Sequence, residues 1–208
     1  MNEADARAWV SQRVSRETLD RFELFAQVLR KWQRSINLVS GSTLPTIYAR
    51  HIADSLQIFE EKPYESGYWV DFGSGAGLPG LICAAAARGH APGLSFTLIE
   101  SDQRKSSFLR EASRIMDTPV TILTQRIEAT APQNARIISA RALASLDTLC
   151  ELSHRHLAPD GEMLFLKGEH HAAEQIAADR NWQMKRRIIP SKTDPRAAIY
   201  RIGALARV

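Results

Sequence analysis

The loop VDFGSGAGLPG at residues 70–80 constrains the fold most, because its four glycines fall within eight positions. A short apolar run precedes this loop and a helix-forming run follows it. Glycines at a strand-to-helix junction permit a tight turn and a close approach of a ligand to the backbone. Free N–H groups at the start of the next helix attract electronegative ligand atoms. The loop therefore predicts a ligand-binding α/β protein, with a purely structural glycine turn as the alternative.

Two cofactor classes compete for this loop. Read from Gly75, it matches the dinucleotide pattern GxGxxG; read from Asp71, it matches D-x-G-x-G-x-G, the first motif of class I methyltransferases that use S-adenosylmethionine. A carboxylate at Asp71 suits a methionine amino group and repels a pyrophosphate. Glu100, at the end of the next predicted strand, would accept ribose hydroxyl hydrogens from either cofactor. We therefore expect Asp71, Gly75 and Glu100 to bind S-adenosylmethionine.

Apolar periodicity sets the rest of the fold. Residues 19–32 carry apolar side chains at helical spacing, whereas the later part of the chain alternates short β-branched runs with helical patterns, which is typical of parallel strands with crossover helices. Two final runs joined by a turn predict an antiparallel hairpin. The predicted strands are 68–72, 95–100, 118–124, 135–140, 162–168, 182–190 and 197–205.

Together these patterns predict a Rossmann-like α/β fold of the class I methyltransferase type. Its mostly parallel seven-stranded sheet would end in the antiparallel hairpin, and an N-terminal helical cap would precede it. We place the cap at residues 1–62 and the methyltransferase domain at 63–208. A nicotinamide dehydrogenase would normally need a further catalytic domain, for which the chain is too short.

The charge is unevenly distributed. Residues 180–208 hold eight basic side chains and one acid, a net charge of +7, whereas the remainder carries −3. Such a basic edge suits a polyanion, because phosphate contacts release condensed counterions; an ordinary solvated charged face is the alternative. The polar N-terminus and the lack of a long apolar run predict a soluble cytoplasmic protein. Cys83 and Cys150 lack metal spacing and are expected to be buried free thiols.

Some methyl acceptors can be excluded. Adenine amines are usually gripped by a DPPY-like or NPPF-like run after the fourth strand, where this chain has SARALASL. Pyrimidine C5 methylation needs a cysteine nucleophile near a strand end, but both cysteines fall in helical patterns. Guanine N7 is an attractive acceptor, because its lone pair needs orientation rather than a general base.

Several motifs occur in order along the chain: W-x4-N-L-V-S (32–40), RHIADSL (50–56), VDFGSGAGLPG (70–80), TLIESDQRKSSFLR (97–110), TQRIEA (124–129), ARALASL (140–146) and LKG (166–168). With these motifs the sequence closely resembles the RsmG (GidB) family of bacterial 16S rRNA guanine-N7 methyltransferases. The resemblance implies a monomer that modifies guanine 527 in the 530 loop of 16S rRNA, either free or within a 30S particle or assembly intermediate. From the residue spacing and the lack of a long apolar run we expect no metal and no membrane contact.

The resemblance also implies cofactor contacts. These would be made by Gly73, Leu78, Ile127, Glu128 and Arg141. One departure is visible, because the family commonly has a serine directly before the motif arginine, where this chain has Ala140 and carries Ser139 one step earlier.

Three basic residues are candidates for the methyl-transfer step. Arg126, Arg141 and Lys167 follow or end what we take to be three neighbouring strands, so we expect them to converge on the ligand crevice. There they would contact the rRNA backbone and place the guanine; surface salt bridges are the alternative.

Other polar pairs have simpler explanations. If RHIADSL is helical, Arg50 and Asp54 are four residues apart and form a local ion pair that fixes the cap, while His51 lies near the substrate. His170 and His171 are adjacent, make a poor metal pair and are expected to be solvated.

Two other functions stay open on sequence grounds. One is a methyltransferase for a small molecule or a protein, which would need no basic edge. The other is a non-catalytic RNA-binding module with a decayed cofactor site.

Overall fold

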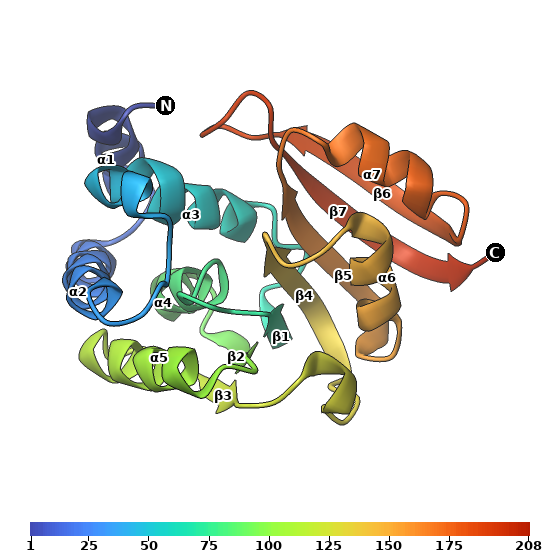
Figure 1. Cartoon of the computed structure of the whole chain (residues 1–208), viewed down its shortest axis with the longest axis horizontal. Helices are drawn as coiled ribbons and strands as arrows, with labels where there is room; N and C mark the ends of the chain where they lie inside the picture. Colours follow the sequence, from blue (N-terminus) through green and yellow to red (C-terminus); the bar gives the residue numbers. More distant parts are fainter.

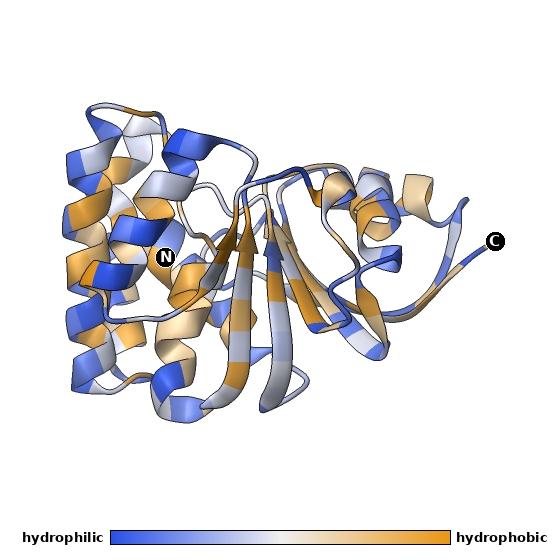
Figure 2. Cartoon of the chain, turned by 90° about the horizontal axis from the view of Figure 1, so that it is seen from below, coloured by the Kyte–Doolittle hydropathy of each residue, from blue (hydrophilic) through white to orange (hydrophobic).

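The computed structural model describes residues 1–208 as one seven-stranded sheet with helices on both faces (Figures 1 and 2). The strand order is β3-β2-β1-β4-β5-β7-β6, with β7 antiparallel to both of its neighbours and all other pairs parallel. The predicted sheet and its terminal hairpin are therefore confirmed. The strands are β1 (Ser66–Phe72), β2 (Gly93–Ile99), β3 (Thr121–Leu123), β4 (Ala135–Arg141), β5 (Leu157–Lys167), β6 (Trp182–Pro190) and β7 (Ala198–Arg207).

Two strands, β3 and β5, differ most in length from the prediction. Strand β3 begins at Thr121 rather than at Thr118, because the N–H and the hydroxyl of Thr118 bond to the carbonyls of Ser113 and Met116 and close the turn after the preceding helix. Strand β5 begins at Leu157, five residues early, where it pairs with the start of β4 before a register shift. In both cases pairing with a neighbour, rather than local pattern, sets the end of the strand.

The helices form two unequal layers (Figures 1 and 2). One layer holds α1 (Glu3–Ser11), α2 (Arg16–Gln33), α3 (Ala53–Glu60), α4 (Gly80–His90) and α5 (Gln103–Ile115), and the other holds α6 (Leu146–His154) and α7 (His171–Ala178). Short 3₁₀ turns at Gly41–Thr46 and Ile127–Ala129 and a π-helical turn at Tyr48–Ile52 complete the elements. None of the helices has the length and apolarity to span a membrane.

The N-terminal helices share a core with the sheet. The apolar face of α2 buries Phe22, Phe25 and Leu29, and the Ser15 side chain accepts the N–H of Thr18 as its N-cap. These side chains belong to one cluster of 38 buried residues that also contains side chains of α4, α5 and β2. The predicted boundary at residue 62 falls in the loop between α3 and β1, while the core continues across it.

The conformation of the glycine loop requires residues that have no side chain. Gly73, Gly75 and Gly77 have positive φ values of 60°, 50° and 78°, which L side chains rarely adopt. Gly80 begins α4 directly against β1, and a Cβ there would lie 2.6 Å from the Cβ of Asp71 and 2.5 Å from a methyl of Leu98. The helix can therefore start this close to the sheet only at a glycine.

We expect Gly80→Ala to lower the free energy of unfolding by about 2 kcal/mol or more, because both atoms that the new methyl meets are held in the core. Gly89→Ala in the same helix is the matched control, since a Cβ there meets nothing closer than 4.0 Å and helix propensity should stabilise it by about 0.5–1 kcal/mol. Urea unfolding measures both variants. Equal stability of the two would contradict the close-packing argument.

Candidate functional site

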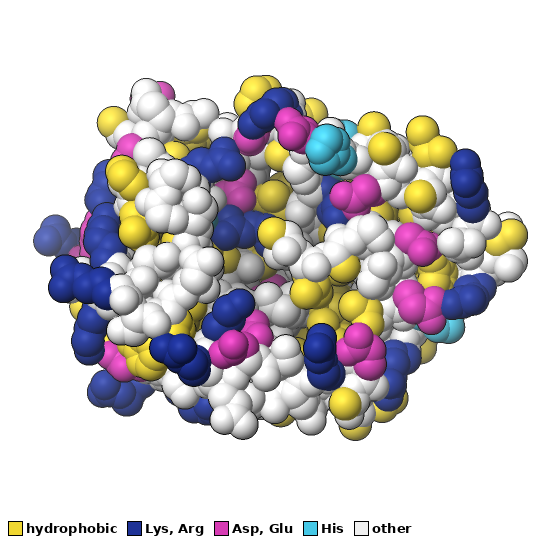
Figure 3. Space-filling view, viewed as in Figure 1, with side chains coloured by type: hydrophobic (Ala, Val, Ile, Leu, Met, Phe, Trp, Pro, Cys, Tyr) yellow, Lys and Arg dark blue, Asp and Glu magenta, His cyan; other side chains and the backbone are white.

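Two cavities open where the parallel strands end, on either side of residues 142–144. The first, of about 410 Å³, is bordered by the glycine loop, the end of β2 and the turn after β3; the second, of about 490 Å³, by the π-helical turn, α3 and the end of β5. Both cavities are lined by Ala142, Leu143 and Ala144. This edge of the sheet is where open α/β proteins bind ligands. Figure 3 shows the corresponding face hollowed between α3 and the loop after β4, with Lys and Arg side chains inside the hollow.

Glu100 is held at the floor of the first cavity. One carboxylate oxygen accepts the N–H of Gly75 at 2.8 Å and the other accepts the N–H of Asp102 at 2.8 Å. The side chain borders the cavity although the residue is only 7% exposed. A carboxylate has about four lone-pair sites, so both oxygens retain capacity for a ligand's hydroxyl hydrogens.

Asp71 lies behind this cavity rather than on its surface. The residue is fully buried, one oxygen accepts the Ser139 hydroxyl at 2.6 Å, and the other oxygen has no partner. Burial raises the pKa of Asp71 to about 6, against the opposing effect of the hydrogen bond from Ser139. Asp71 is therefore not part of the cavity wall, and its predicted contact with a ligand amino group stays a prediction. Ser139, one step before Ala140, supports Asp71 instead.

The other predicted cofactor residues are divided between surface and core. Gly73, Gly75, Ile127 and Glu128 line the first cavity, whereas Leu78 is 5% exposed and packs in the large apolar core. The structure thus does not bring the Leu78 side chain to the cavity wall.

Leu143 is the residue that sequence reasoning missed. It is 38% exposed and lines both cavities. Its side chain lies over Gly73, so that a Cβ added to Gly73 would lie 2.5 Å from the Cδ1 methyl of Leu143. Ala142 before it has a φ of 52°, a left-handed conformation that costs free energy in a non-glycine residue. No local pattern in the sequence marks Leu143, because its position over Gly73 depends on tertiary contacts.

Arg141 occupies the second cavity and is held by three acceptors. One terminal nitrogen donates to Asp54 Oδ2 and to the Arg50 carbonyl, each at 3.0 Å, and the other donates to His51 Nδ1 at 3.1 Å. The predicted local pair between Arg50 and Asp54 is therefore wrong, because Arg50 instead pairs with Asp194 at 3.2 Å. Residues 48–52 form a π-helical turn, whose wider winding changes the α-helical i,i+4 spacing.

The bonding of His51 fixes its tautomer. Arginine can only donate, so Nδ1 accepts from Arg141 and the proton is on Nε2, which donates to the Thr43 hydroxyl at 2.8 Å. Thr43 in turn donates to the Ser40 carbonyl at 2.7 Å. Burial, followed by the nearby charges of Arg141 and Arg50, lowers the pKa of His51 to about 3. His51 is thus a neutral support for Arg141 on the wall of the second cavity.

Lys167 also lines the second cavity, but its ammonium is already occupied. It donates to the Ala144 carbonyl at 2.6 Å and pairs with Glu174 at 2.5 Å, while Glu174 accepts the N–H of Leu146 at 2.8 Å. Lys167 and Glu174 therefore anchor the loop after β4 at its end, where the chain enters α6.

Arg126 does not converge with Arg141 and Lys167 as expected. Strand β3, which Arg126 follows, is separated from β4 by β2 and β1 in the sheet. Arg126 is instead exposed at the first cavity, with no carboxylate within 4.0 Å of its guanidinium. The expectation of three neighbouring strands was wrong, since chain order does not give strand order.

The basic C-terminal segment is largely neutralised by ion pairs. Only Arg180 and Lys185 of its eight cations have no carboxylate within 4.0 Å. The paired cations are Arg186 with Asp179, Arg187 with Glu61, Lys192 with Glu60, Arg196 with Glu169 and Asp194, Arg201 with Glu162 and Arg207 with Glu151. The charge count therefore overstates the basic surface that is available to a polyanion.

Two smaller expectations concern the cysteines and the adjacent histidines. Cys83 in α4 and Cys150 in α6 are buried free thiols, as expected. His170 is exposed, but the expectation that His171 is solvated was wrong, because it is half-buried and its Nδ1 bonds to the Tyr200 hydroxyl at 2.9 Å. No group of three or more His, Cys, Asp or Glu side chains is arranged to hold a metal ion.

Most of the chain matches a known protein family. A family model described as "rRNA small subunit methyltransferase G" (GidB) matches residues 18–198. The chain belongs to this family. Ribosomal RNA small subunit methyltransferase G from a strain of Cereibacter sphaeroides is 47% identical over 208 residues, which is 100% of each chain. That of Gluconobacter oxydans is 49% identical over 195 residues, covering 94% of this chain and 98% of the relative.

Solved structures extend the comparison beyond the GidB family. The ribosomal protein L11 methylase of Lactobacillus delbrueckii subsp. bulgaricus has a TM-score of 0.58 at 18% identity and covers 74% of this chain and 78% of its own. M. jannaschii TYW2 in complex with AdoMet has a TM-score of 0.57 at 13% identity, over 84% and 80% of the two chains. These matches confirm the Rossmann-like methyltransferase fold.

The burial of the Asp71 carboxyl can be tested by the pH dependence of protein stability. Its pKa is raised from 3.8 to about 6 in the folded state, so the folded protein binds the proton more tightly than the unfolded chain. Its contribution to stability is therefore fully present below about pH 3 and is lost as the pH rises through about 6, by about 3 kcal/mol in total. Because Asn does not titrate, we expect the difference in unfolding free energy between wild type and Asp71→Asn to fall by about 2 kcal/mol between about pH 4 and 6, and by about 3 kcal/mol in all by about pH 7.

Denaturant unfolding at several pH values measures this difference. Above pH 7 it should be constant, because Asp71 is then ionised in both states. Parallel stability curves across the whole range would mean that the buried carboxyl does not carry the shift.

Proposed function

We propose that this protein transfers a methyl group from S-adenosylmethionine to N7 of guanine 527 in the 530 loop of 16S rRNA. Membership of the rRNA small subunit methyltransferase G family over residues 18–198 carries this proposal. Two cavities that share one wall support it, because a methyl transfer needs a donor site and an acceptor site side by side. A monomer acting on free 16S rRNA or on a 30S particle belongs to the same proposal.

The first cavity suits the cofactor. Its volume of about 410 Å³ is in the range of small-molecule sites. The free lone pairs of Glu100 suit two ribose hydroxyls, and the glycine backbone at Gly73 and Gly75 permits close approach. Ile127 and Glu128 would border the adenine end. When bound, the cofactor supplies an electrophilic methyl group on a sulfonium sulfur.

The Arg141 guanidinium has free N–H groups that could bind an anion between the two cavities. Of its five N–H groups, three are taken by Asp54, His51 and the Arg50 carbonyl, so Nε–H and one terminal N–H are free. Two such donors on one guanidinium match the two oxygens of a carboxylate. We assign them to the methionine carboxylate of the cofactor, with His51 and Asp54 holding the guanidinium in place.

The second cavity suits an acceptor that needs no deprotonation. Its two carboxylates are both committed, Asp54 to Arg141 and Glu174 to Lys167, and His51 is occupied at both nitrogens. No free general base is therefore present among the cavity residues. Guanine N7 carries an in-plane lone pair, so positioning alone would suffice for an in-line displacement. Leu143, on the shared wall, offers an apolar surface beside the reacting atoms.

Glu100→Gln tests the cofactor site by calorimetry with S-adenosylmethionine. An amide places an N–H₂ group against one of the backbone N–H donors and removes the charge, so we expect the affinity to fall about 10- to 100-fold. Glu65→Gln, a 70% exposed side chain outside both cavities, is the control and should bind as wild type does. Wild-type affinity in Glu100→Gln would remove Glu100 from the site, and no binding by the wild type would favour a non-catalytic RNA-binding module.

Mapping N7-methylguanine in 16S rRNA tests the reaction itself. Cells without the gene should lack the modification at guanine 527, and the wild-type gene should restore it. Arg141→Ala should fail to restore it, because the free donors and the clamp at the shared wall are lost; Arg34→Ala, an exposed residue of the α2 C-cap, should succeed. Persistence of the modification after deletion would mean that the proposed target is wrong.

A further inference from the structure

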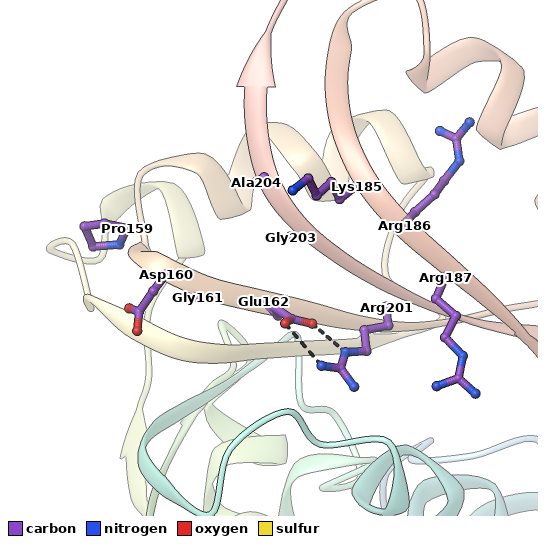
Figure 4. A pocket seen from close by; sticks show the side chains of 10 residues that line it. All are labelled: Pro159, Asp160, Gly161, Glu162, Lys185, Arg186, Arg187, Arg201, Gly203 and Ala204. Atoms are coloured by element: carbon purple, nitrogen blue, oxygen red, sulfur yellow. Dashed lines mark hydrogen bonds and ion pairs between the residues drawn. The ribbon is translucent and has the colours of Figure 1, made fainter.

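A third cavity lies far from the two described above. It has a volume of about 570 Å³ and shares no residue with either of them. Figure 4 shows it on the β5–β7–β6 part of the sheet. It is lined by Pro159, Asp160, Gly161, Glu162, Lys185, Arg186, Arg187, Arg201, Gly203 and Ala204.

This cavity lies on a sheet face that no helix covers. Helices α6 and α7 lie against the opposite face of these strands, and the other helix layer reaches only as far as β5 through α3 (Figure 1). Glu162 and Lys185 both pair with Gly203, and Arg187 pairs with Arg201, so these side chains share one face of the sheet. A glycine in the middle of β7 deepens the groove between the charged side chains on either side of it.

Most of the charges in the groove are already paired. Arg201 makes a bidentate contact with Glu162 at 2.5 and 3.2 Å, and Asp160 is matched by Arg136 at 3.2 Å. Arg186 turns away from the groove in Figure 4 and pairs with Asp179. The lining therefore holds four cations and two carboxylates, and its surplus is positive.

Two cations account for this surplus. Lys185 is exposed and has no carboxylate within 4.0 Å, and Arg187 is 68% exposed with its nearest carboxylate, that of Glu61, at 3.8 Å. Residues i and i+2 of a strand point to the same side about 7 Å apart. Each of the two can therefore meet a separate anionic group of one extended ligand.

We propose that this groove is a second docking surface for the phosphate backbone of the substrate RNA. The inference rests on the proposed function, because a ribosomal RNA is the polyanion that such an enzyme meets. The groove lies toward the amino end of β5, whereas Lys167 at the other end lines the second cavity, about 17 Å away along the strand. The contact is therefore with an RNA segment other than the methylated loop, and it orients the long substrate without taking part in the chemistry.

The test is a double variant, Lys185→Gln/Arg187→Gln, compared with Arg30→Gln/Arg34→Gln. The control pair has the same charge change, is exposed on or beside α2 and has no carboxylate within 4.0 Å. For the groove variant we expect the KM for full-length 16S rRNA to rise at least about fivefold and the slope of log affinity against log salt to fall by about 1.4–1.8, as for two lost phosphate contacts. The control should shift neither quantity beyond twofold.

Two further measurements keep the result interpretable. S-adenosylmethionine affinity of the groove variant, measured by calorimetry, reports an intact fold and cofactor site. A target-loop oligonucleotide too short to reach the groove is the internal comparison, because only the long RNA should show the full loss.

Several outcomes would overturn the inference. Equal losses of RNA affinity in the groove variant and the control would mean that binding depends on the overall charge of the protein rather than on the groove. Unchanged RNA binding with reduced solubility would mean that Lys185 and Arg187 only protect the edge strand β6 from pairing with other chains. Failure of the wild type to methylate rRNA would instead reject the proposed function, and RNA-binding isotherms alone would then decide on the groove.

Discussion

The ion pair between Arg141 and Asp54 holds the site together. The two side chains are 15% and 10% exposed and approach to 3.0 Å, so removing either one would leave a largely buried charge, at a cost of about 3–5 kcal/mol. The other oxygen of Asp54 accepts from Gln57 and from Thr193 in the turn between β6 and β7. One carboxylate thereby joins the helical cap, the end of β4 and the terminal hairpin. The second cavity exists because these three parts are held in contact.

The wall between the two cavities is also held in place by a side-chain ion pair. Lys167 and Glu174 hold the loop after β4 at Ala144 and Leu146, which leaves Leu143 projecting over the glycine loop. Gly73 must lack a side chain for this contact, as well as for its positive φ. Glycines in such loops are usually explained by the ligand alone. Here the first glycine also accommodates the wall that the two cavities share.

Sequence patterns predicted the strands well, but they predicted poorly which strands and which side chains lie next to each other. Period and motif gave the seven strands, the hairpin and the placement of Glu100 and Ile127 at a cavity, because these depend on residues close together in the chain. The grouping of Arg126 with Lys167 failed, since it depends on the order in which strands pair. The local Arg50–Asp54 pair failed for a related reason, because a π-helical turn and a distant arginine decide the partner of Asp54. Leu143 carries no local signal and acquires its position only from tertiary contacts.

The net charge of the C-terminal segment is also a poor guide to its surface, because most of its cations pair with carboxylates elsewhere in the fold. Six of the eight C-terminal cations are paired, but exposed pairs are worth only about 0–1 kcal/mol and are weakened by salt, so a phosphate can compete for them. The Arg201–Glu162 pair is less easily displaced, because it is bidentate and both side chains are 30% or less exposed. A polyanion would therefore meet a fixed, neutral groove floor flanked by adjustable cations at its edge. The proposed docking would draw its specificity from that arrangement rather than from the charge of the segment, since a uniformly unpaired basic surface would bind any RNA equally.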